Sequence, residues 1–137
     1  MLKNQLSKIR YSILESCHRI KEGHIGSAFS IVEILFVIFR SHFKKNYFIL
    51  SKGHAAIGAY AVMNHFGILK NKDYQSFCSF NSKLGGHPDS TKLPNFNFST
   101  GSLGHGLPVS TGLAFSLKKN GDRRHVICLI GDQELME

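Results

Sequence analysis

The sequence predicts an α/β fold in which a parallel sheet is flanked by helices, and three observations support this prediction. Residues 126–130 form an apolar run, bounded by charged residues before it and by glycine after it. This length and composition favour a strand buried on both faces, as in parallel sheets. Residues 47–50 predict a second short buried strand. The segments between these strands mostly show helical rather than alternating apolar spacing.

The first helix is predicted over residues 3–21, where apolar residues recur at steps of three and four. The members of this stripe are Leu6, Ile9, Ile13, Cys17 and Ile20. Ser30 and Glu33 match a capping box, in which a hydroxyl and a carboxylate satisfy free backbone amides at a helix start. Residues 34–39 that follow are apolar on every face, which predicts a buried helix. Further helices are predicted over residues 55–66, 72–77 and 107–119, with a long functional loop over residues 81–100.

Composition and charge narrow the classes of function. The chain has 137 residues, enough for one domain over residues 1–137 with its own core and no second domain. The net charge is +8, but the 17 Lys and Arg residues are spread along the chain, which disfavours nucleic-acid binding and suits a phosphorylated ligand. The longest apolar run is too short to span a bilayer, so no membrane association is expected. Three scattered cysteines and no recognisable signal peptide fit a reducing cytoplasm.

Two stretches predict a site for a phosphorylated ligand and a cation. Residues 99–106 form a glycine-rich loop directly before a helix, where backbone amides and the helix N-terminus favour an anion. Asp132 follows the strand at residues 126–130, and ligands of α/β folds collect beyond the carboxyl ends of strands. A carboxylate at this place suits Mg²⁺. Each stretch alone is also consistent with an ordinary polar turn, but together they predict a diphosphate cradle beside a metal ligand.

Three histidines follow a glycine at an element boundary: His24, His54 and His87. A single histidine in a loop is more often an exposed residue without a functional role than a catalytic group. Three in the same setting favour a role in chemistry, because catalytic groups concentrate on loops held by a rigid scaffold. Imidazole moves protons and binds hydroxyls near neutral pH.

Five motifs, in the same order along nearly the whole chain, resemble the N-terminal part of transketolase, in the form that is split into two subunits. They are residues 22–30 with 33–35, residues 48–55, residues 86–89, residues 99–107 and residues 130–137. The resemblance implies a thiamine diphosphate-binding fold, of which this chain is the N-terminal part only. It also implies a cytoplasmic transferase of the pentose phosphate pathway.

The same resemblance implies roles for individual residues. Asp132 matches the Mg²⁺ ligand of the cofactor motif, and Glu137 matches a glutamate that links the two halves of a dimeric site. His24, His54 and His87 match histidines around the reactive carbon and the sugar hydroxyls, which makes them, with Glu137, the candidate catalytic residues. The implied cofactor-binding residues are His54, Gly101, Ser102, Leu103, Gly104, Asp132 and Gln133.

The sequence departs from the family pattern at several positions. Gln133 replaces the second glycine of the cofactor motif, so a side chain could crowd the diphosphate. Ile25 replaces a usual proline, and His105 replaces a usual glutamine. The chain ends at Glu137, before an asparagine pair that supplies another metal ligand in the family. We therefore expect a truncated chain that is inactive by itself.

The function implied is transfer of a two-carbon ketol unit between sugar phosphates, with thiamine diphosphate and Mg²⁺ as cofactors. The partners implied are further copies of the chain in a homo-oligomer, together with a C-terminal transketolase subunit. Two alternatives stay open. One is a catalytically inactive remnant that acts as a binding or interaction module, and the other is a different thiamine diphosphate enzyme, such as a deoxyxylulose-phosphate-synthase-like protein.

Overall fold

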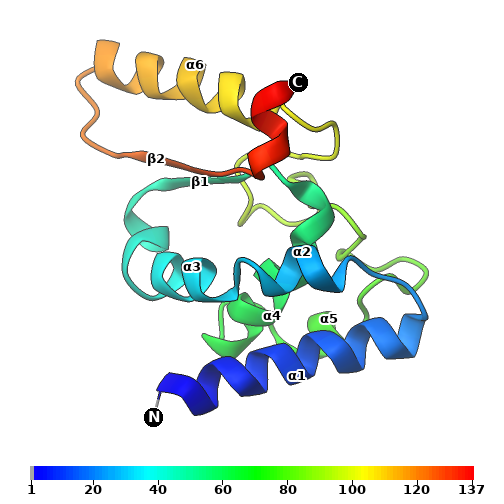
Figure 1. The fold of residues 1–137 in the computed structure, drawn as a ribbon. Helices are drawn as coiled ribbons and strands as arrows, with labels where there is room; N and C mark the ends of the chain where they lie inside the picture. Colours follow the sequence, from blue (N-terminus) through cyan, green and yellow to red (C-terminus); the bar gives the residue numbers. More distant parts are fainter. Residues whose placement is uncertain (1) are drawn as a thin grey trace.

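The computed structural model describes residues 2–137, which form six α-helices and two β-strands (Figure 1). The helices are α1 (Leu2–Ile20), α2 (Ile25–Phe29), α3 (Val32–Val37), α4 (Ala56–His65), α5 (Asn71–Gln75) and α6 (Gly106–Lys119). The strands are β1 (Tyr47–Leu50) and β2 (Val126–Leu129), and β2 is followed by the short 3-10 helix η4 (Asp132–Met136). The predicted helices and strands are present with small shifts at their ends, whereas α2 was not predicted.

The two strands are parallel neighbours, so the predicted parallel sheet is confirmed. Tyr47 pairs with Val126 and Leu50 with Leu129, which places the carboxyl ends of both strands at the same edge. Helix α6 covers one face of the strand pair, while α1 to α4 lie on the other (Figure 1). Residues that follow the two strands therefore emerge side by side.

Strand β2 is less buried than its sequence predicts. It ends at Leu129 rather than at residue 130, and Val126, Ile127 and Cys128 are only half-buried. In contrast, Phe48, Ile49 and Leu50 of β1 are fully buried. The prediction of burial on both faces is wrong for β2. Both strands have a single strand neighbour, but the loop ending at Asn97 and Thr100 bonds to the free edge of β1, whereas no strand within residues 2–137 pairs with the other edge of β2.

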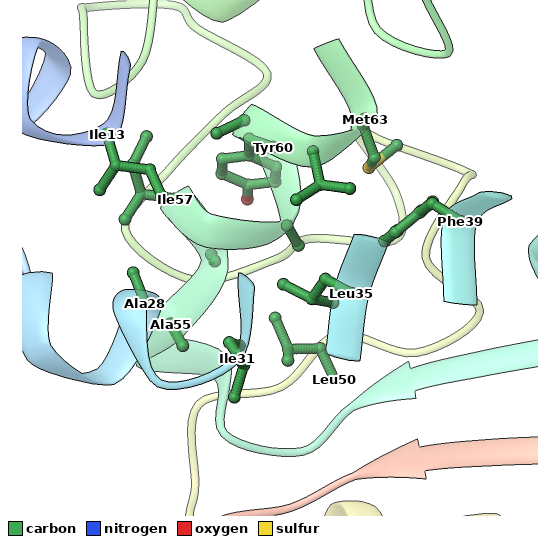
Figure 2. Packing of buried hydrophobic residues seen from close by; sticks show 14 of the residues in the cluster. Ile13, Ala28, Ile31, Leu35, Phe39, Leu50, Ala55, Ile57, Tyr60 and Met63 are labelled. Carbon is green, nitrogen blue, oxygen red and sulfur yellow. The ribbon is translucent and has the colours of Figure 1, made fainter. Parts of the chain in front are cut away.

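The core lies between α1, α3, α4 and β1. Figure 2 shows Ile57 and Tyr60 of α4 between Ile13 of α1 and Leu35 of α3. The predicted stripe of α1 is confirmed, since its central residues are buried in this core. Nearly every residue of α4 is buried, in keeping with its position between two other helices.

The predicted capping box at Ser30 is wrong. Ser30 ends α2, and its hydroxyl donates to the carbonyl oxygen of Ser27 at 2.9 Å. Helix α3 begins after Ile31, and no side chain caps it. Glu33 instead accepts a hydrogen bond from Arg10 of α1 at 2.6 Å. Because the unpredicted helix α2 extends to Phe29, Ser30 lies at the C-terminal end of α2. Ile31 therefore occupies the N-cap position of α3.

The segment at residues 34–39 is not buried on every face, contrary to the prediction. Leu35 is fully buried, but Ile34 is 47% exposed and Val37 is 55% exposed. The segment continues as a π-helical turn, η1 (Ile38–His42), which carries the chain toward β1. This apolar segment thus packs one face against α4 and leaves its other face exposed.

Leu35→Ala should lower the free energy of unfolding by about 2–5 kcal/mol, because it leaves a cavity in a closely packed region. Ile34→Ala is the matched control on the same helix and should cost less than about 1 kcal/mol, because its side chain is already half exposed. Urea unfolding followed by circular dichroism measures both values. Equal losses in the two variants would contradict this description of α3.

The predicted loop over residues 81–100 contains no helix or strand, and it is tied to the rest of the fold. Leu84, Leu93 and Phe96 are buried in the core. The side-chain oxygen of Asn97 accepts from the Phe48 amide at 2.8 Å, and the Thr100 hydroxyl donates to the Leu50 carbonyl at 2.6 Å. These bonds hold the end of the loop against β1.

Across residues 2–137, no helix has both the length and the apolar character needed to cross a membrane.

Candidate functional site

The candidate functional residues lie at the edge of the sheet where both strands end. Ser51 follows β1, Gly131 follows β2, and the two strands are in parallel register. The C-terminal turn, red in Figure 1, lies beside the loop that leads into α6. In α/β folds this edge is where ligands bind.

His24, His54 and His87 line one pocket of about 280 Å³. The rings of His24 and His54 meet edge to face, with centroids 5.3 Å apart. His24 precedes α2, His54 lies in the turn after β1, and His87 belongs to the long loop. The structure therefore brings together three histidines that are far apart in the sequence. The walls of the pocket also include Glu22, Ile57, Phe77 and Cys78.

Partial burial lowers the pKa of His54, and the nearby positive charges of His24 and Lys52 lower it further. The charge of Glu134 opposes this effect, and His87 adds a small lowering. His54 therefore carries a neutral imidazole over a wider pH range than a free histidine. A neutral imidazole can accept a proton or bind a hydroxyl group.

The lowered pKa of His54 makes the stability of the fold depend on pH. The unfolded chain binds a proton at its ordinary pKa near 6.5 while the folded chain does not, so stability is full above that pH and falls as the pH drops below it. We expect His54→Gln to reduce this loss when unfolding is measured by urea titration from pH 7 to pH 5. The control is His125→Gln at an exposed position. If both variants keep the pH dependence of the unsubstituted chain, the role of His54 is refuted.

The glycine-rich loop at residues 99–106 lies against this pocket. A Cβ atom added to Gly101 would come within 3.6 Å of the His87 ring, and one added to Gly53 would come within 2.9 Å of the Thr100 carbonyl. Within residues 2–137, the amides of Gly101, Ser102 and Leu103 have no protein hydrogen-bond partner, and all three residues are exposed. Three successive free amides before the N-terminus of α6 suit an anionic group.

The loop also meets the segment that follows β2. The Gly104 amide donates to the Glu134 carboxylate at 3.1 Å. Gly104 has a φ of +79°, and a Cβ atom there would lie 2.8 Å from the Cβ atom of Glu137. Glycine is therefore required by both conformation and space. The glycine-rich loop and the segment after β2, which the sequence predicts to form one site, are therefore in direct contact.

Asp132 and Gln133 are exposed at the start of η4. In the part of the chain from residue 2 to residue 137, no three His, Cys, Asp or Glu side chains are grouped so that they could hold a metal ion. Asp132 can offer one carboxylate. Because Mg²⁺ commonly takes one or two carboxylates together with phosphate oxygens and water, Asp132 fits a metal ion shared with a bound diphosphate.

Sequence reasoning missed Glu134 and Ser51. Glu134 is 7% exposed, and its carboxylate accepts from the Ser51 hydroxyl at 2.7 Å and from the Gly131 amide at 2.7 Å. A signal existed, because a glutamate three residues after the start of a helical turn can bond back to the first amide. The contact with Ser51 spans most of the chain, and no local pattern indicates it.

Comparison with known proteins identifies the family. The family model described as "Transketolase, thiamine diphosphate binding domain" matches residues 2–137. One of the subunits of apulose-4-phosphate transketolase from Actinobacillus succinogenes is 39% identical over 84% of this chain, and human transketolase is 35% identical over 99%. This chain spans 45% of the first relative and 23% of the second.

Solved structures show the same fold. A transketolase variant from Pichia stipitis matches with a TM-score of 0.85 and 24% identity, over 98% of this chain and 23% of that one. Transketolase from Leishmania mexicana matches with a TM-score of 0.80 and 23% identity, over 100% of this chain and 24% of that one. The predicted α/β thiamine diphosphate-binding fold is confirmed. With a family model matched from residue 2 to residue 137, the chain belongs to the transketolase family, through its thiamine diphosphate binding domain.

Proposed function

We propose that the chain is the N-terminal part of a transketolase, which transfers a two-carbon ketol unit between sugar phosphates with thiamine diphosphate and Mg²⁺. The observation that carries this proposal is the contact between the glycine-rich loop and the segment after β2, beside a pocket lined by three histidines. The relatives named transketolase support the reaction class. A solved relative from Pichia stipitis is described as a complex with sedoheptulose-7-phosphate, which supports sugar phosphates as the substrate class.

The free amides of Gly101, Ser102 and Leu103 would bind the diphosphate of thiamine diphosphate, with the N-terminus of α6 adding a favourable field. Asp132 would bind Mg²⁺ beside it, at the carboxyl end of β2. Gly104 would contribute mainly through its conformation, because its amide is bound to Glu134. When bound, thiamine diphosphate supplies the carbanion chemistry that breaks and forms the carbon–carbon bond.

The histidines would handle protons and sugar hydroxyls. His54, with its lowered pKa, is suited to accept a proton from a hydroxyl group near neutral pH. His24 and His87 line the same pocket and would orient the substrate. The net charge of +8 would draw phosphorylated sugars to the protein.

We further propose that residues 1–137 act as one domain in an assembly with a second copy of the chain and with a C-terminal transketolase subunit. Relatives from Actinobacillus succinogenes and Phocaeicola vulgatus are each named as one of the subunits of a transketolase, which supports a partner chain. Glu137 is exposed next to Gly104, where it could meet a second copy.

An activity assay tests this function. Residues 1–137 replace the matching segment of the apulose-4-phosphate transketolase subunit from Actinobacillus succinogenes. This chimaera is mixed with its C-terminal subunit, thiamine diphosphate and Mg²⁺, and a ketose phosphate donor is offered with an aldose phosphate acceptor. We expect two-carbon transfer that requires both subunits and the diphosphate form of thiamine. No transfer in the complete mixture would refute the proposal, and turnover of a 2-oxo acid donor instead would favour another thiamine diphosphate enzyme.

One observation favours an inactive binding module as the second candidate. Gln133 occupies the place of a motif glycine, next to the proposed metal ligand. Calorimetric titration with thiamine diphosphate and Mg²⁺ separates the candidates. Saturable, metal-dependent heat supports the cofactor role, whereas no heat with the partner subunit present supports the binding module.

A further inference from the structure

The carboxylate of Glu134 joins three segments that are separate in the sequence. It is almost completely buried, and one oxygen accepts from the Ser51 hydroxyl at 2.7 Å and the Gly104 amide at 3.1 Å. The other oxygen accepts from the Gly131 amide at 2.7 Å. These donors belong to the end of β1, the glycine-rich loop and the end of β2. One side chain thus connects every segment of the proposed cofactor site except the histidine pocket.

The donor set suits a carboxylate, which can accept hydrogen bonds at both of its oxygens. Two main-chain amides and a hydroxyl point at the two oxygens, and within residues 2–137 no Lys or Arg pairs with Glu134. Hydrogen bonds to a charged acceptor are stronger than neutral ones. A glutamine side chain has a single acceptor oxygen, so one of the two glycine amides would face an NH₂ group instead.

The backbone around Glu134 leaves little freedom for another arrangement. The amide of Glu134 donates to the Gly131 carbonyl at 3.2 Å, which closes a reciprocal pair with the Gly131 amide. A Cβ atom added to Gly106 would lie 2.8 Å from the Cα atom of Ser51. The loop is therefore held at Gly104 by Glu134 and at Gly106 by direct packing against Ser51.

We propose that Glu134 is a positioning residue of this site. By binding the Gly104 amide, it fixes the glycine-rich loop against the carboxyl ends of both strands and so sets the place of the free amides at Gly101 to Leu103 relative to Asp132. This inference rests on the proposed function, in which those amides bind a diphosphate. The structural part of this inference is that Glu134 keeps the loop ordered, and it does not depend on a bound ligand.

Hydrogen–deuterium exchange tests the structural part on the chain without ligand. In Glu134→Leu, the amides of Gly104 and Gly131, followed residue by residue by NMR, should exchange at least about tenfold faster, because each loses its hydrogen bond to the carboxylate. Amides of α1 and α4 should stay unchanged. The exchange rates in Glu134→Gln should lie between those of the unsubstituted chain and Glu134→Leu. The glutamine variant decides the result if the leucine variant does not fold. Glu33→Leu removes an exposed carboxylate that binds Arg10 and serves as the matched control. Unchanged loop exchange in both Glu134 variants would overturn the inference.

Calorimetry with thiamine diphosphate and Mg²⁺, in the complex with the partner subunit, tests the functional part. Affinity should fall at least about tenfold in Glu134→Leu, recover in part in Glu134→Gln and stay unchanged in Glu33→Leu. Unaltered affinity in a Glu134 variant with a mobile loop would overturn the positioning role. Absence of binding by the unsubstituted complex would instead refute the proposed function, while the exchange result would still report on Glu134.

Discussion

Asp132→Ala should weaken the Mg²⁺-dependent binding of thiamine diphosphate by at least about 100-fold. Groups that merely orient metal ligands are worth about 10–100-fold, so loss of a ligand itself should cost at least as much. Asp132 is exposed at the end of β2, and within residues 2–137 it belongs to no cluster of metal-binding side chains that could replace it. Calorimetric titration of the chain with its partner subunit measures the effect.

The control for this experiment is Asp122→Ala. Asp122 is held by Arg124 before β2, at the opposite end of the strand from Asp132, so its removal should leave cofactor affinity unchanged. Folding of both variants is checked by circular dichroism. If Asp132→Ala binds the cofactor as tightly as the unsubstituted protein does, Asp132 is not the metal ligand.

Gly106→Ala should destabilise the fold by about 1–3 kcal/mol, because the added methyl group has no room. Its Cβ atom would lie 2.8 Å from the Cα atom of Ser51 and closer still to the Ser51 side chain. Ser51 is fully buried, and its amide donates to the Leu129 carbonyl at 2.9 Å, so it cannot move without disturbing both strands. Urea unfolding measures the loss.

Gly112→Ala provides the control on the same helix. Nothing lies within 4 Å of a Cβ atom at Gly112, so alanine should stabilise α6 by about 0.5–1 kcal/mol through its better helix propensity. The two substitutions should therefore have opposite signs. A stabilising Gly106→Ala would show that the close approach between α6 and the end of β1 is not required.

Several parts of the fold and of the site follow from local sequence. The stripe of α1 has a helical period, and the apolar run of β1 between polar ends is typical of a buried strand, so both elements are present as predicted. The glycine-rich loop before α6 and the Gly-Asp pair after β2 also appear where their residues place them. These features depend on neighbours within a few positions, and that information is contained in the sequence.

Other parts depend on contacts between distant segments. Ser30 has the chemistry of a helix cap, but it ends α2 with its hydroxyl bonded to Ser27, and Ile31 takes the N-cap position of α3. Ile34 and Val37 are as apolar as Leu35, yet only the position of α4 decides which of them is buried. The half-burial of β2 likewise depends on which strands and helices lie beside it.

The sequence by itself determined the helix and strand periods, the glycines at turns and the residue types able to bind a diphosphate, a metal ion and a sugar. Only the tertiary structure decided that His24, His54 and His87 share one pocket and that Glu134 binds Ser51 and Gly104. The physical reason is the range of the interactions. Local spacing fixes backbone conformation, whereas burial and hydrogen-bond partners depend on how segments far apart along the chain pack together.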